Sequence, residues 1–577
     1  MPVLSKPLPA LTAKTNLVTT LEAKVQERMK EMTLEEKVGQ MIMPALKANS
    51  NFDFKQVKEN IQNYHVGGYH FVLDEHGLHK QRSIKKLINW MQNQSQLPLL
   101  IASDFEGGLG FYFNDATRVP RAMAIGATGD TNSAYEIAQI VAKEARALGV
   151  HINFYPDVDI NSNSKNPIIN IRSFGAEPDL VSSMAVQYIR GLQQNKVIAV
   201  AKHFPGHGNT SIDSHIGLPT VNSSLEELKK LELKPFQASI DEGVQGIMSA
   251  HVLLPKVDEQ MLPATMSKPI LTNLLKEQMG FKGLLFTDAM MMGSIAKNYP
   301  NASSCVMAVK AGADVILYPV NVAESYQSIL KAVKEGEISE ERINESVKKI
   351  LLKKYELGLL ESLSGIRTGT THQDKLKHEK TASLVMERAI TLVKDSNSLL
   401  PLELNPSSKV LIINLVDKGN GWREGAPGEF FKKKFLDKKV NLKSYLVTEE
   451  INSSKVNEII AEAKEADVLI VAGHVQVSAF KGSIDFSENQ IKLLKELSAA
   501  NENNIFVMFG NPYVIAFITE FSSYVLAYEC YPGAETAAAK AITGEVPFKG
   551  KLPVEIDGFY KLGHYVKAKN KKSKASQ

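Results

Sequence analysis

The 577-residue sequence has few cysteines, two tryptophans and no long apolar run. Its two cysteines, Cys305 and Cys530, lie far apart in the chain, and neither has a zinc ligand set around it. We expect two buried free thiols, with a single disulfide as the alternative. The first residues, MPVLSKPLPALTAKTN, lack the apolar stretch that a signal peptide or a membrane span needs. The sequence therefore predicts no membrane span, and a cytoplasmic protein if this start is native, or a periplasmic or secreted one if a leader has been removed.

The sequence also lacks an excess of charge of either sign. It has 67 basic and 63 acidic residues, a net charge of +4, so no nucleic-acid partner is expected. Basic residues cluster at the C-terminal end, in a tail at 561–577, and a short run of lysines is typical of a solvated segment. Apolar residues are plentiful, at 44% of the chain, and a chain of this length is expected to form two or three domains.

The first 360 residues alternate between short apolar runs and stretches of helical length. Eight runs are predicted as strands: Val38–Pro44, Gly67–Val72, Leu99–Asp104, His151–Ile160, Val197–His203, Gly246–His251, Gly283–Asp288 and Ala313–Tyr318. Helices are predicted at Thr131–Leu148, Leu180–Gln194, Ser224–Glu242, Lys268–Gln278, Ala323–Glu335 and Ser339–Leu357. This pattern predicts a TIM-type (β/α)8 barrel over residues 19–360, after an N-terminal extension at 1–18. An open doubly wound sheet is the alternative, but it needs a chain reversal that the sequence does not reveal.

A second α/β unit is predicted after a linker. Residues 361–380 lack apolar periodicity and are rich in Ser, Thr, Gly, Lys and His, which is typical of a linker. Six apolar runs follow between residues 390 and 528, with helical stretches at Val456–Glu465 and Glu488–Ala500. We expect residues 381–560 to form an α/β sandwich with a mainly parallel sheet, ahead of the basic tail at 561–577.

Ionisable residues stand at the C-terminal ends of the predicted barrel strands. They are Asp104, Lys202, His203, His251 and Asp288. Any strand needs a polar residue where it leaves the core, so one such residue alone indicates little. In a barrel, however, these strand ends meet at one face, where the active sites of such barrels lie. We therefore expect the five side chains to converge on one mouth.

The segment Ala201–Pro219, AKHFPGHGNTSIDSHIGLP, combines three histidines, a lysine and an aspartate with closely spaced glycines. This glycine density predicts a flexible loop. Histidine clusters often bind metals, but the spacing here is irregular and Lys202 would oppose a cation, so no metal site is predicted. Asp213 and His215 form a candidate acid–base dyad instead, because an imidazole titrates near neutrality and a nearby carboxylate orients it and stabilises its cation.

The stretch KHFPGHGNTSIDSHIGLP resembles the signature of the β-N-acetylglucosaminidases of glycoside hydrolase family 3. Other segments resemble elements of that family in the same order: SDFEGG at 103–108, NFYPDVDIN at 153–161, IRSFG at 171–175, PATMS at 263–267 and GFKGLLFTDAMMMGSI at 280–295. AITLVKD at 389–395, NPY at 511–513, YPGAETAAAKAITGE at 531–545 and GKLPVEI at 550–556 resemble landmarks of the family's second domain. The resemblance spans about residues 20 to 560 and implies a retaining exo-β-N-acetylglucosaminidase.

The resemblance implies three catalytic roles. Asp288 matches the nucleophile that attacks the anomeric carbon, His215 matches the general acid/base, and Asp213 matches the residue that holds the histidine. The chemistry agrees, because an oxocarbenium-like transition state gains from a carboxylate and the departing oxygen needs a proton. Retaining glycosidases usually use two carboxylates, and here a histidine replaces one of them.

Four further residues match positions that bind the terminal sugar in the family. Asp104 matches a carboxylate that grips sugar hydroxyls, and Arg172, Lys202 and His203 match hydrogen-bond donors. The implied partner is a saccharide, either a cell-wall fragment, a chito-oligosaccharide or a related glycan. No cofactor is implied, because hydrolysis of a glycoside needs only side chains and water.

One element departs from the family pattern. After its Asp-x-Glu-Gly-Gly element the family usually has Arg-Val-x-Arg, whereas this sequence has Leu109–Tyr112, so the substrate-contacting second arginine is absent. Arg118 and Arg121, from the same loop, are candidates to replace it. The departure leaves open a β-glucosidase-like preference for another sugar. Phosphorolysis is also open, because a neutral histidine would not repel phosphate as a glutamate would. An inactive glycan-binding protein is the remaining alternative, although all three implied catalytic side chains are present.

Overall fold

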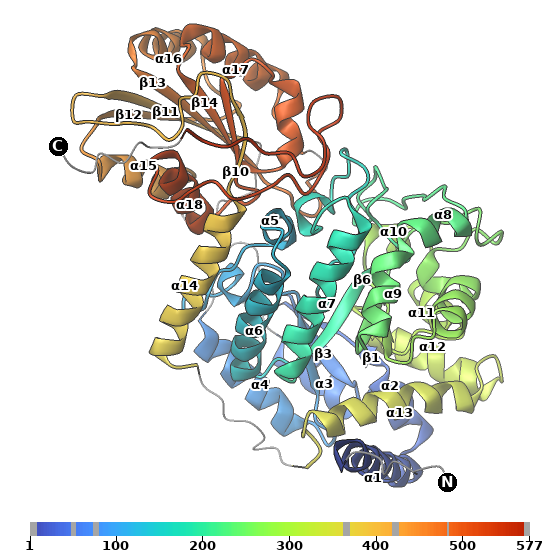
Figure 1. The fold of residues 1–577 in the computed structure, drawn as a ribbon. Helices are drawn as coiled ribbons and strands as arrows, with labels where there is room; N and C mark the ends of the chain where they lie inside the picture. The colour runs from blue at the N-terminus through green and yellow to red at the C-terminus, as the bar shows by residue number, and fades with distance from the viewer. Residues whose placement is uncertain are drawn as a thin grey trace, which may run out of the picture.

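The computed structural model describes residues 9–47, 53–72, 80–361, 370–417, 426–481 and 484–569. These form two α/β units, and Figure 1 shows the second unit above the first. A long helix, α1 (Pro9–Glu31), crosses the predicted limit of the N-terminal extension and packs against the last helix of the first unit, α13 (Glu340–Glu356). No helix in the described part of the chain combines the length and apolar character that crossing a membrane requires.

The first unit is a barrel of parallel strands. They are β1 (Ile42–Met43), β2 (Ala45–Lys47), β3 (Gly68–Val72), β4 (Leu100–Ser103), β5 (Ile152–Asn153), β6 (Ile198–Phe204), β7 (Gly246–Ser249), β8 (Leu284–Phe286) and β9 (Ile316–Leu317). Strands β2 to β8 pair in chain order, and β1 pairs with β9. A parallel bridge between Phe286 and Val315 joins β8 to β9 and closes the ring. Because β1 and β2 are one strand interrupted at Pro44, eight strand positions result, and the predicted barrel is confirmed.

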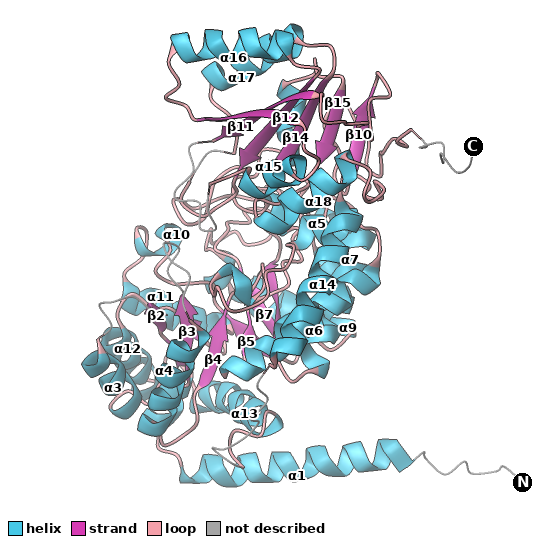
Figure 2. Ribbon diagram, turned by 90° about the vertical axis from the view of Figure 1, so that its left-hand side faces the viewer, coloured by secondary structure: helices cyan, strands magenta, loops and turns pink. Residues whose placement is uncertain are grey.

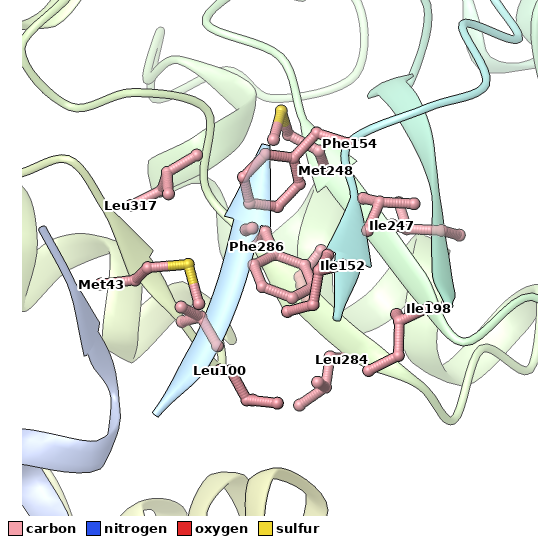
Figure 3. Packing of buried hydrophobic residues seen from close by; sticks show 14 of the residues in the cluster. Met43, Leu100, Ile152, Phe154, Ile198, Ile247, Met248, Leu284, Phe286 and Leu317 are labelled. Carbon is pink, nitrogen blue, oxygen red and sulfur yellow. The ribbon is translucent and has the colours of Figure 1, made fainter. Parts of the chain in front are cut away.

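Helices surround this ring, as Figure 2 shows. They are α2 (Leu34–Gln40), α3 (Phe54–Gln62), α4 (Gln81–Gln94), α5 (Ala122–Ala127), α6 (Thr131–Leu148), α7 (Pro178–Gln194), α8 (Leu225–Lys230), α9 (Leu233–Asp241), the π-helix η4 (Pro269–Gln278), α10 (Gly293–Ala296), α11 (Asn301–Ala311), α12 (Val322–Lys334) and α13. The inside of the ring is filled by apolar side chains from many strands, including Met43, Ile152 and Leu317 (Figure 3). Phe154 and Phe286 pack edge to face there, with ring centroids 5.4 Å apart.

Three expectations for the barrel differ from the structure. The run Val38–Pro44 starts as helix, because Thr33 and Glu36 form a capping box that begins α2 at Leu34. Of the run His151–Ile160, only β5 is a strand, since Asp159 turns toward β6 and accepts the backbone N–H of His203, in β6, and of His207, in the loop that follows β6. The helix expected at Ser224–Glu242 breaks into α8 and α9, because Pro235 fits only in the first turn of a helix.

The second unit is a six-stranded sheet between helices. Its strands are β10 (Thr391–Asp395), β11 (Lys409–Val416), β12 (Asn441–Val447), β13 (Val468–Val475), β14 (Asn504–Gly510) and β15 (Ser523–Leu526), in the order β10-β15-β14-β13-β11-β12. Only the β10–β15 pair is antiparallel. Helices α16 (Ser453–Glu465) and α17 (Glu488–Ala500) cover one face, and α15 (Glu429–Leu436) and α18 (Pro532–Ile542) cover the other (Figure 1). The predicted sandwich with a mainly parallel sheet is confirmed.

The segments around this unit differ in part from expectation. Residues 372–380, assigned to the linker, form the first half of helix α14 (His372–Ala389), which begins with a capping box of Thr371 and Asp374. In the tail assigned to solvent, the N–H groups of Val566 and Lys569 donate to backbone carbonyls of the second unit. Residues 362–369 of the linker and 570–577 of the tail lie outside the described residues. Cys305 and Cys530 are free, as predicted, but Cys530 is only partly buried.

A buried ion pair joins the two units. Arg121, from the barrel, donates through Nε to Oε1 of Glu529 at 2.7 Å and through Nη2 to Oε2 at 3.2 Å. The backbone N–H of Arg121 also donates to Oε1, at 2.9 Å, and the Glu529 side chain is fully buried. Amide side chains cross the same seam, where Asn161 donates to the hydroxyl of Tyr513. The second unit therefore lies against the C-terminal face of the barrel.

We expect Glu529→Ala to lower the free energy of unfolding by about 3–5 kcal/mol, because it leaves the Arg121 guanidinium buried without its carboxylate. Denaturant unfolding followed by fluorescence would measure the loss. Glu226→Ala, which breaks an exposed pair with Lys229, is the matched control and should leave the unfolding midpoint unchanged. Equal stability of Glu529→Ala and the parent protein would contradict the proposed importance of this seam.

Candidate active site

A cavity of about 370 Å³ opens at the C-terminal face of the barrel, and both units line it. Among the residues that the sequence singled out, it is lined by Asp104, Arg172, Lys202, His203, His215 and Asp288. Asp213 lies behind His215, and its side chain is almost fully buried. His251 is not among the lining residues. Its side chain bonds to Thr265 and to the carbonyl of Ala289, directly after Asp288. Four of the five strand-end residues therefore meet at one mouth, and His251 lies behind it.

Asp104 is held between two basic groups. It follows β4, and its Oδ1 accepts a hydrogen bond from Lys202 Nζ at 2.8 Å while Oδ2 lies 2.8 Å from Nε2 of His70. Burial raises the pKa of Asp104, but Lys202 and His70 outweigh it and hold this pKa well below its usual range. The carboxylate is thus charged and fixed, with its side chain still 30% exposed toward the cavity. Such a group can accept hydrogen bonds from ligand hydroxyls.

A second carboxylate of the same loop, Glu106, binds Arg172 in a bidentate pair. Arg172 Nε and Nη2 lie 2.9 and 2.8 Å from the two carboxylate oxygens, and Lys202 Nζ lies 3.0 Å from Oε1. Burial raises the pKa of Glu106, but the two cations lower it further than burial raises it. Burial also opposes the charge of Lys202, yet Asp104 and Glu106 keep its pKa above the ordinary value. The cations at the cavity floor are therefore permanently charged and rigidly placed.

Asp157 adds a third carboxylate beneath these cations. Its oxygens lie 3.1 Å from Arg172 Nη2 and 3.6 Å from Lys202 Nζ, and its side chain is fully buried. Neither oxygen has a well-formed hydrogen bond among the described residues. Burial, with the neighbouring Glu106 charge, raises the pKa of Asp157 to about 7 against the pull of Arg172 and Lys202. This carboxyl group is the one in the cluster that titrates near neutrality.

Asp288 follows β8 and faces several imidazoles. Its Oδ1 accepts the N–H of Ala289 at 2.7 Å. Burial alone would raise the pKa of Asp288, but His203, His251 and His215 together hold it below the ordinary value. An ionised carboxylate in this position is a suitable nucleophile.

The dyad of Asp213 and His215 is formed as the sequence suggested. His215 Nδ1 lies 2.7 Å from Asp213 Oδ1, and the His215 backbone N–H donates to the same oxygen at 2.9 Å. Burial raises the pKa of Asp213, but the hydrogen bonds from His215 bring it below the ordinary value. The other oxygen, Oδ2, accepts the backbone N–H of Phe480, from the second unit, at 2.9 Å. His215 itself stays a quarter exposed to the cavity.

Hydrogen bonds also fix the loop that carries the dyad. His203 Nδ1 lies 2.7 Å from Asp159 Oδ2, and the His207 N–H donates to Oδ1 of the same carboxylate at 2.7 Å. The His207 ring bridges the hydroxyls of Thr210 and Ser214, each at 2.8 Å. Burial and the charge of His203 lower the pKa of His207 to about 4, so this ring is neutral and structural. A segment that its glycines predicted to be flexible is therefore well ordered around His207.

Asp157, Asp159 and His203 are the one group in the described chain whose ligand atoms lie close enough together to hold a metal ion. These atoms already have other contacts. Asp157 faces two cations, and both Asp159 oxygens accept hydrogen bonds from the β6 loop. A further cation would have to displace Lys202 and Arg172, so the geometry favours a salt-bridge cluster over a metal centre.

Comparisons with known proteins identify the family of the chain. The description "Glycosyl hydrolase family 3 N terminal domain" matches residues 33–352, more than half of the chain, and "Glycosyl hydrolase family 3 C-terminal domain" matches residues 390–575. The chain belongs to glycosyl hydrolase family 3. It is therefore a glycoside hydrolase, as the motifs of the sequence implied.

Three relatives of this glycoside hydrolase illustrate the range of the family. The structure of a β-N-acetylglucosaminidase from Paenibacillus sp. is 32% identical, with a TM-score of 0.80, and covers 91% of this chain and 99% of its own. A β-N-acetylglucosaminidase/β-glucosidase from Cellulomonas fimi is 29% identical over 489 residues, which are 81% of this chain and 85% of that protein. The structure of a β-glucoside phosphorylase bound to 2FGlc is 26% identical, with a TM-score of 0.84, and covers 93% of this chain and 97% of its own.

The segment that departs from the family pattern lies at the cavity. Phe111 lines it, and the Arg118 guanidinium lies between the rings of Phe111 and Tyr531, with its carbon 4.5 and 4.9 Å from the ring centroids. Arg118 Nη1 also donates to the carbonyl of Gly107 at 2.9 Å. Arg121 is engaged by Glu529. Of the two candidate arginines, Arg118 is therefore the one that stacks on aromatic rings of the cavity wall, one ring from each unit.

Several residues at the candidate site of this glycoside hydrolase were not predicted from the sequence. Glu106 stands two positions after Asp104, and Asp157 and Asp159 interrupt an apolar run. Acidic residues at or after the end of a predicted strand could therefore have indicated these three positions. His70 was visible only as a polar residue in a predicted strand. Phe480 carried no signal, because it comes from a loop of the other unit.

We expect Asp157→Asn to change the pH dependence of stability. Because the folded-state pKa of Asp157 is raised to about 7, the folded protein holds a proton that the unfolded chain releases near pH 4, and ionisation lowers the free energy of unfolding as pH rises. The difference in unfolding free energy, parent minus Asp157→Asn, should fall between about pH 4 and pH 7 and be level at higher pH. Urea titrations of both proteins at several pH values would measure it. A constant difference would mean that Asp157 keeps the same charge throughout.

Proposed function

We propose that this hydrolase removes terminal β-linked N-acetylglucosamine from glycans such as cell-wall fragments or chito-oligosaccharides, with retention at the anomeric carbon. The observation that carries the proposal is the hydrogen-bonded Asp213–His215 pair, whose histidine lines the same cavity as Asp288. The relatives from Paenibacillus and Cellulomonas, which bear the names of β-N-acetylglucosaminidases, support the choice of sugar.

In the first step of the proposed reaction, an Asp288 oxygen attacks C1 of the terminal sugar. The bond from C1 to the glycosidic oxygen breaks, and His215 gives its Nε2 proton to the departing oxygen. A covalent glycosyl ester on Asp288 results. Asp213, which accepts hydrogen bonds from the ring and the backbone of His215, stabilises the imidazolium that delivers the proton.

In the second step, neutral His215 takes a proton from a water molecule as that water attacks C1. The ester bond breaks, and Asp288 leaves as a carboxylate. His215 is again protonated, so the site is ready for another substrate. The same imidazole serves as acid in the first step and as base in the second.

Four residues are proposed to hold the terminal sugar. Asp104 accepts hydrogen bonds from hydroxyls, and Lys202, Arg172 and His203 donate them, since all four line the cavity and are held by charged neighbours. Because these contacts are already formed without a ligand, few side chains need to be reoriented when the sugar binds.

Phosphorolysis is the second candidate. The acid/base is a histidine, which is neutral in the second step and does not repel an anion. The similarity to a β-glucoside phosphorylase also supports it. In this reaction an oxygen of phosphate, in place of water, attacks C1 of the glycosyl ester. The bond from C1 to Asp288 breaks, Asp288 leaves as a carboxylate, and the product is a sugar 1-phosphate.

A panel of 4-nitrophenyl β-glycosides that differ only at the 2-position would test the sugar. We expect kcat/KM for the N-acetylglucosaminide to exceed that for the glucoside by at least about tenfold, because polar groups meant for one substituent are left unpaired by another. Each assay is run with and without inorganic phosphate, and products are separated into free sugar and sugar 1-phosphate. Asp288→Asn supplies the inactive control. A preference for the glucoside would overturn the proposed substrate, and sugar 1-phosphate as the main product would replace hydrolysis by phosphorolysis.

We expect His215→Ala to slow substrates with poor leaving groups by about 10²–10⁴-fold more than activated aryl glycosides, because only the poor leaving groups need protonation. Asp213→Ala should give a milder form of the same pattern, since Asp213 acts through the imidazole. Azide needs no general base and should restore part of the second step in His215→Ala. Steady-state rates over a series of aryl glycosides with graded leaving-group acidity would decide. Equal losses across the series would mean that the acid/base lies elsewhere.

A further inference from the structure

A short segment of the second unit reaches the proposed acid/base. It is the strap Gln476–Lys481, which directly follows β13 and, apart from Lys481, lines the cavity. Within it, the backbone N–H of Phe480 donates to Asp213 Oδ2 at 2.9 Å. The Phe480 ring lies edge to face on the His215 ring, with centroids 5.0 Å apart. Phe480 therefore contacts both members of the dyad from a part of the chain more than 260 residues away.

The contact with Asp213 completes the hydrogen bonding of its carboxylate. Oδ1 accepts both the ring and the backbone N–H of His215, and Oδ2 accepts Phe480. A carboxylate bonded on one side only can rotate about its terminal torsion, which is broad in energy. With donors on both oxygens, the plane of the carboxylate is fixed, and so is the direction in which it holds the imidazole.

The backbone conformation of Phe480 is unfavourable for a bulky residue, which indicates that its side chain has a functional role. Its φ is +65°, in the left-handed region, where a glycine or asparagine is favoured and a bulky residue is rare. Phe480 is also 62% exposed, so it contributes little to the core. A glycine here would be less strained. Among the described residues, the contact that a phenylalanine ring adds at this position is the edge-to-face contact with His215.

The strap itself is firmly anchored. The carboxylate of Asp417, which directly follows β11, accepts a hydrogen bond from the N–H of Gln476 at 3.0 Å. It also forms an ion pair with Lys481. Lys481 Nζ also donates to the carbonyl of Gln476 at 2.7 Å, which closes the strap into a tight loop. The Asp417 and Lys481 side chains are both nearly fully buried. The strap can thus hold Phe480 in place against the dyad.

We propose that Phe480 is a positioning residue, which fixes the orientation of Asp213 and His215 so that the proton reaches the departing oxygen. The second unit is then part of the acid/base machinery and not only a neighbour of the barrel. This inference rests on the proposed role of His215. It predicts that loosening the strap affects the step that needs a proton and spares the attack of Asp288.

The test uses Phe480→Gly in the full-length protein, with the graded aryl glycosides. Glycine keeps the backbone N–H and relieves the strained φ, so stability should not fall, while the ring contact is lost. We expect kcat/KM to fall about 10- to 100-fold for poor leaving groups and to change little for activated ones, as expected of a misplaced acid. Phe480→Tyr should restore the parent rates. Phe517→Ala, which truncates another exposed phenylalanine of the same unit outside the cavity lining, is the matched control and should leave all rates unchanged.

A second variant tests the anchor. In Asp417→Asn/Lys481→Met both buried charges are removed together, so neither is left unpaired, and the introduced amide oxygen can still accept the Gln476 N–H. It should show the same dependence on leaving-group acidity as Phe480→Gly. His215→Ala is run beside both as the benchmark. If His215→Ala lacks that dependence, the proposed acid/base is wrong. If His215→Ala has it and Phe480→Gly either matches the parent or loses equally on all substrates, Phe480 does not position the dyad. A loss that follows the size of the leaving group, with raised KM, would also overturn the inference, since it would place Phe480 in leaving-group binding.

Discussion

The site depends on the ion pairs that the buried ammonium of Lys202 makes with neighbouring carboxylates. Three carboxylates, Asp104, Glu106 and Asp157, lie within 3.6 Å of this ammonium, and Arg172 supplies the second cation of the cluster. In a barrel mouth of low dielectric, the cations of Lys202 and Arg172 and the carboxylates of Asp104 and Glu106 could not remain charged without one another, because an isolated buried ion costs several kcal/mol. Removing one partner would therefore disturb all of them. The cluster gives the barrel a polar floor whose donors and acceptors are fixed before any sugar arrives.

The second unit packs against the barrel beside this floor and supplies part of the cavity wall. Glu529 pairs with Arg121 at the seam, and the ring of Tyr531, two residues later, lies on Arg118 in the cavity wall. The strap then brings Phe480 to the dyad from above. The barrel supplies the proposed nucleophile and the proposed sugar-binding charges, and the second unit lines the cavity wall and contacts the proposed acid/base. A single cavity shared in this way ties the position of the two units to the chemistry.

Much of this arrangement was predictable from local pattern. Helices at Thr131–Leu148 and Glu488–Ala500 match their predicted limits, because both combine a capping residue with strong apolar periodicity. The ends of β4, β6 and β8 were correctly expected to carry Asp104, Lys202 and Asp288 to one mouth. Prediction from the sequence failed where long-range contacts determine the structure. Asp159, for example, was predicted to lie in a strand but instead accepts a hydrogen bond from the backbone of His203 in β6. Phe480 meets Asp213 only once both units are folded, so no pattern within either segment predicts the contact.

The choice of histidine as the proposed acid/base follows from the charges already present. Asp104, Glu106, Asp157 and Asp288 crowd the floor, and burial together with the Glu106 charge raises the pKa of Asp157. A glutamate at the position of His215 would add a fifth carboxylate near Asp288 and would raise the pKa of both. An imidazole would avoid this, since an acid/base of this kind is positively charged before it gives its proton and neutral afterwards. Asp213 can stabilise the cationic form because it lies behind the ring, outside the cavity lining, where its own charge is balanced by three N–H donors. A neutral base in the second step would also leave the cavity open to an anionic acceptor, so the electrostatic argument for a histidine keeps phosphate beside water as a proposed acceptor of the glycosyl group.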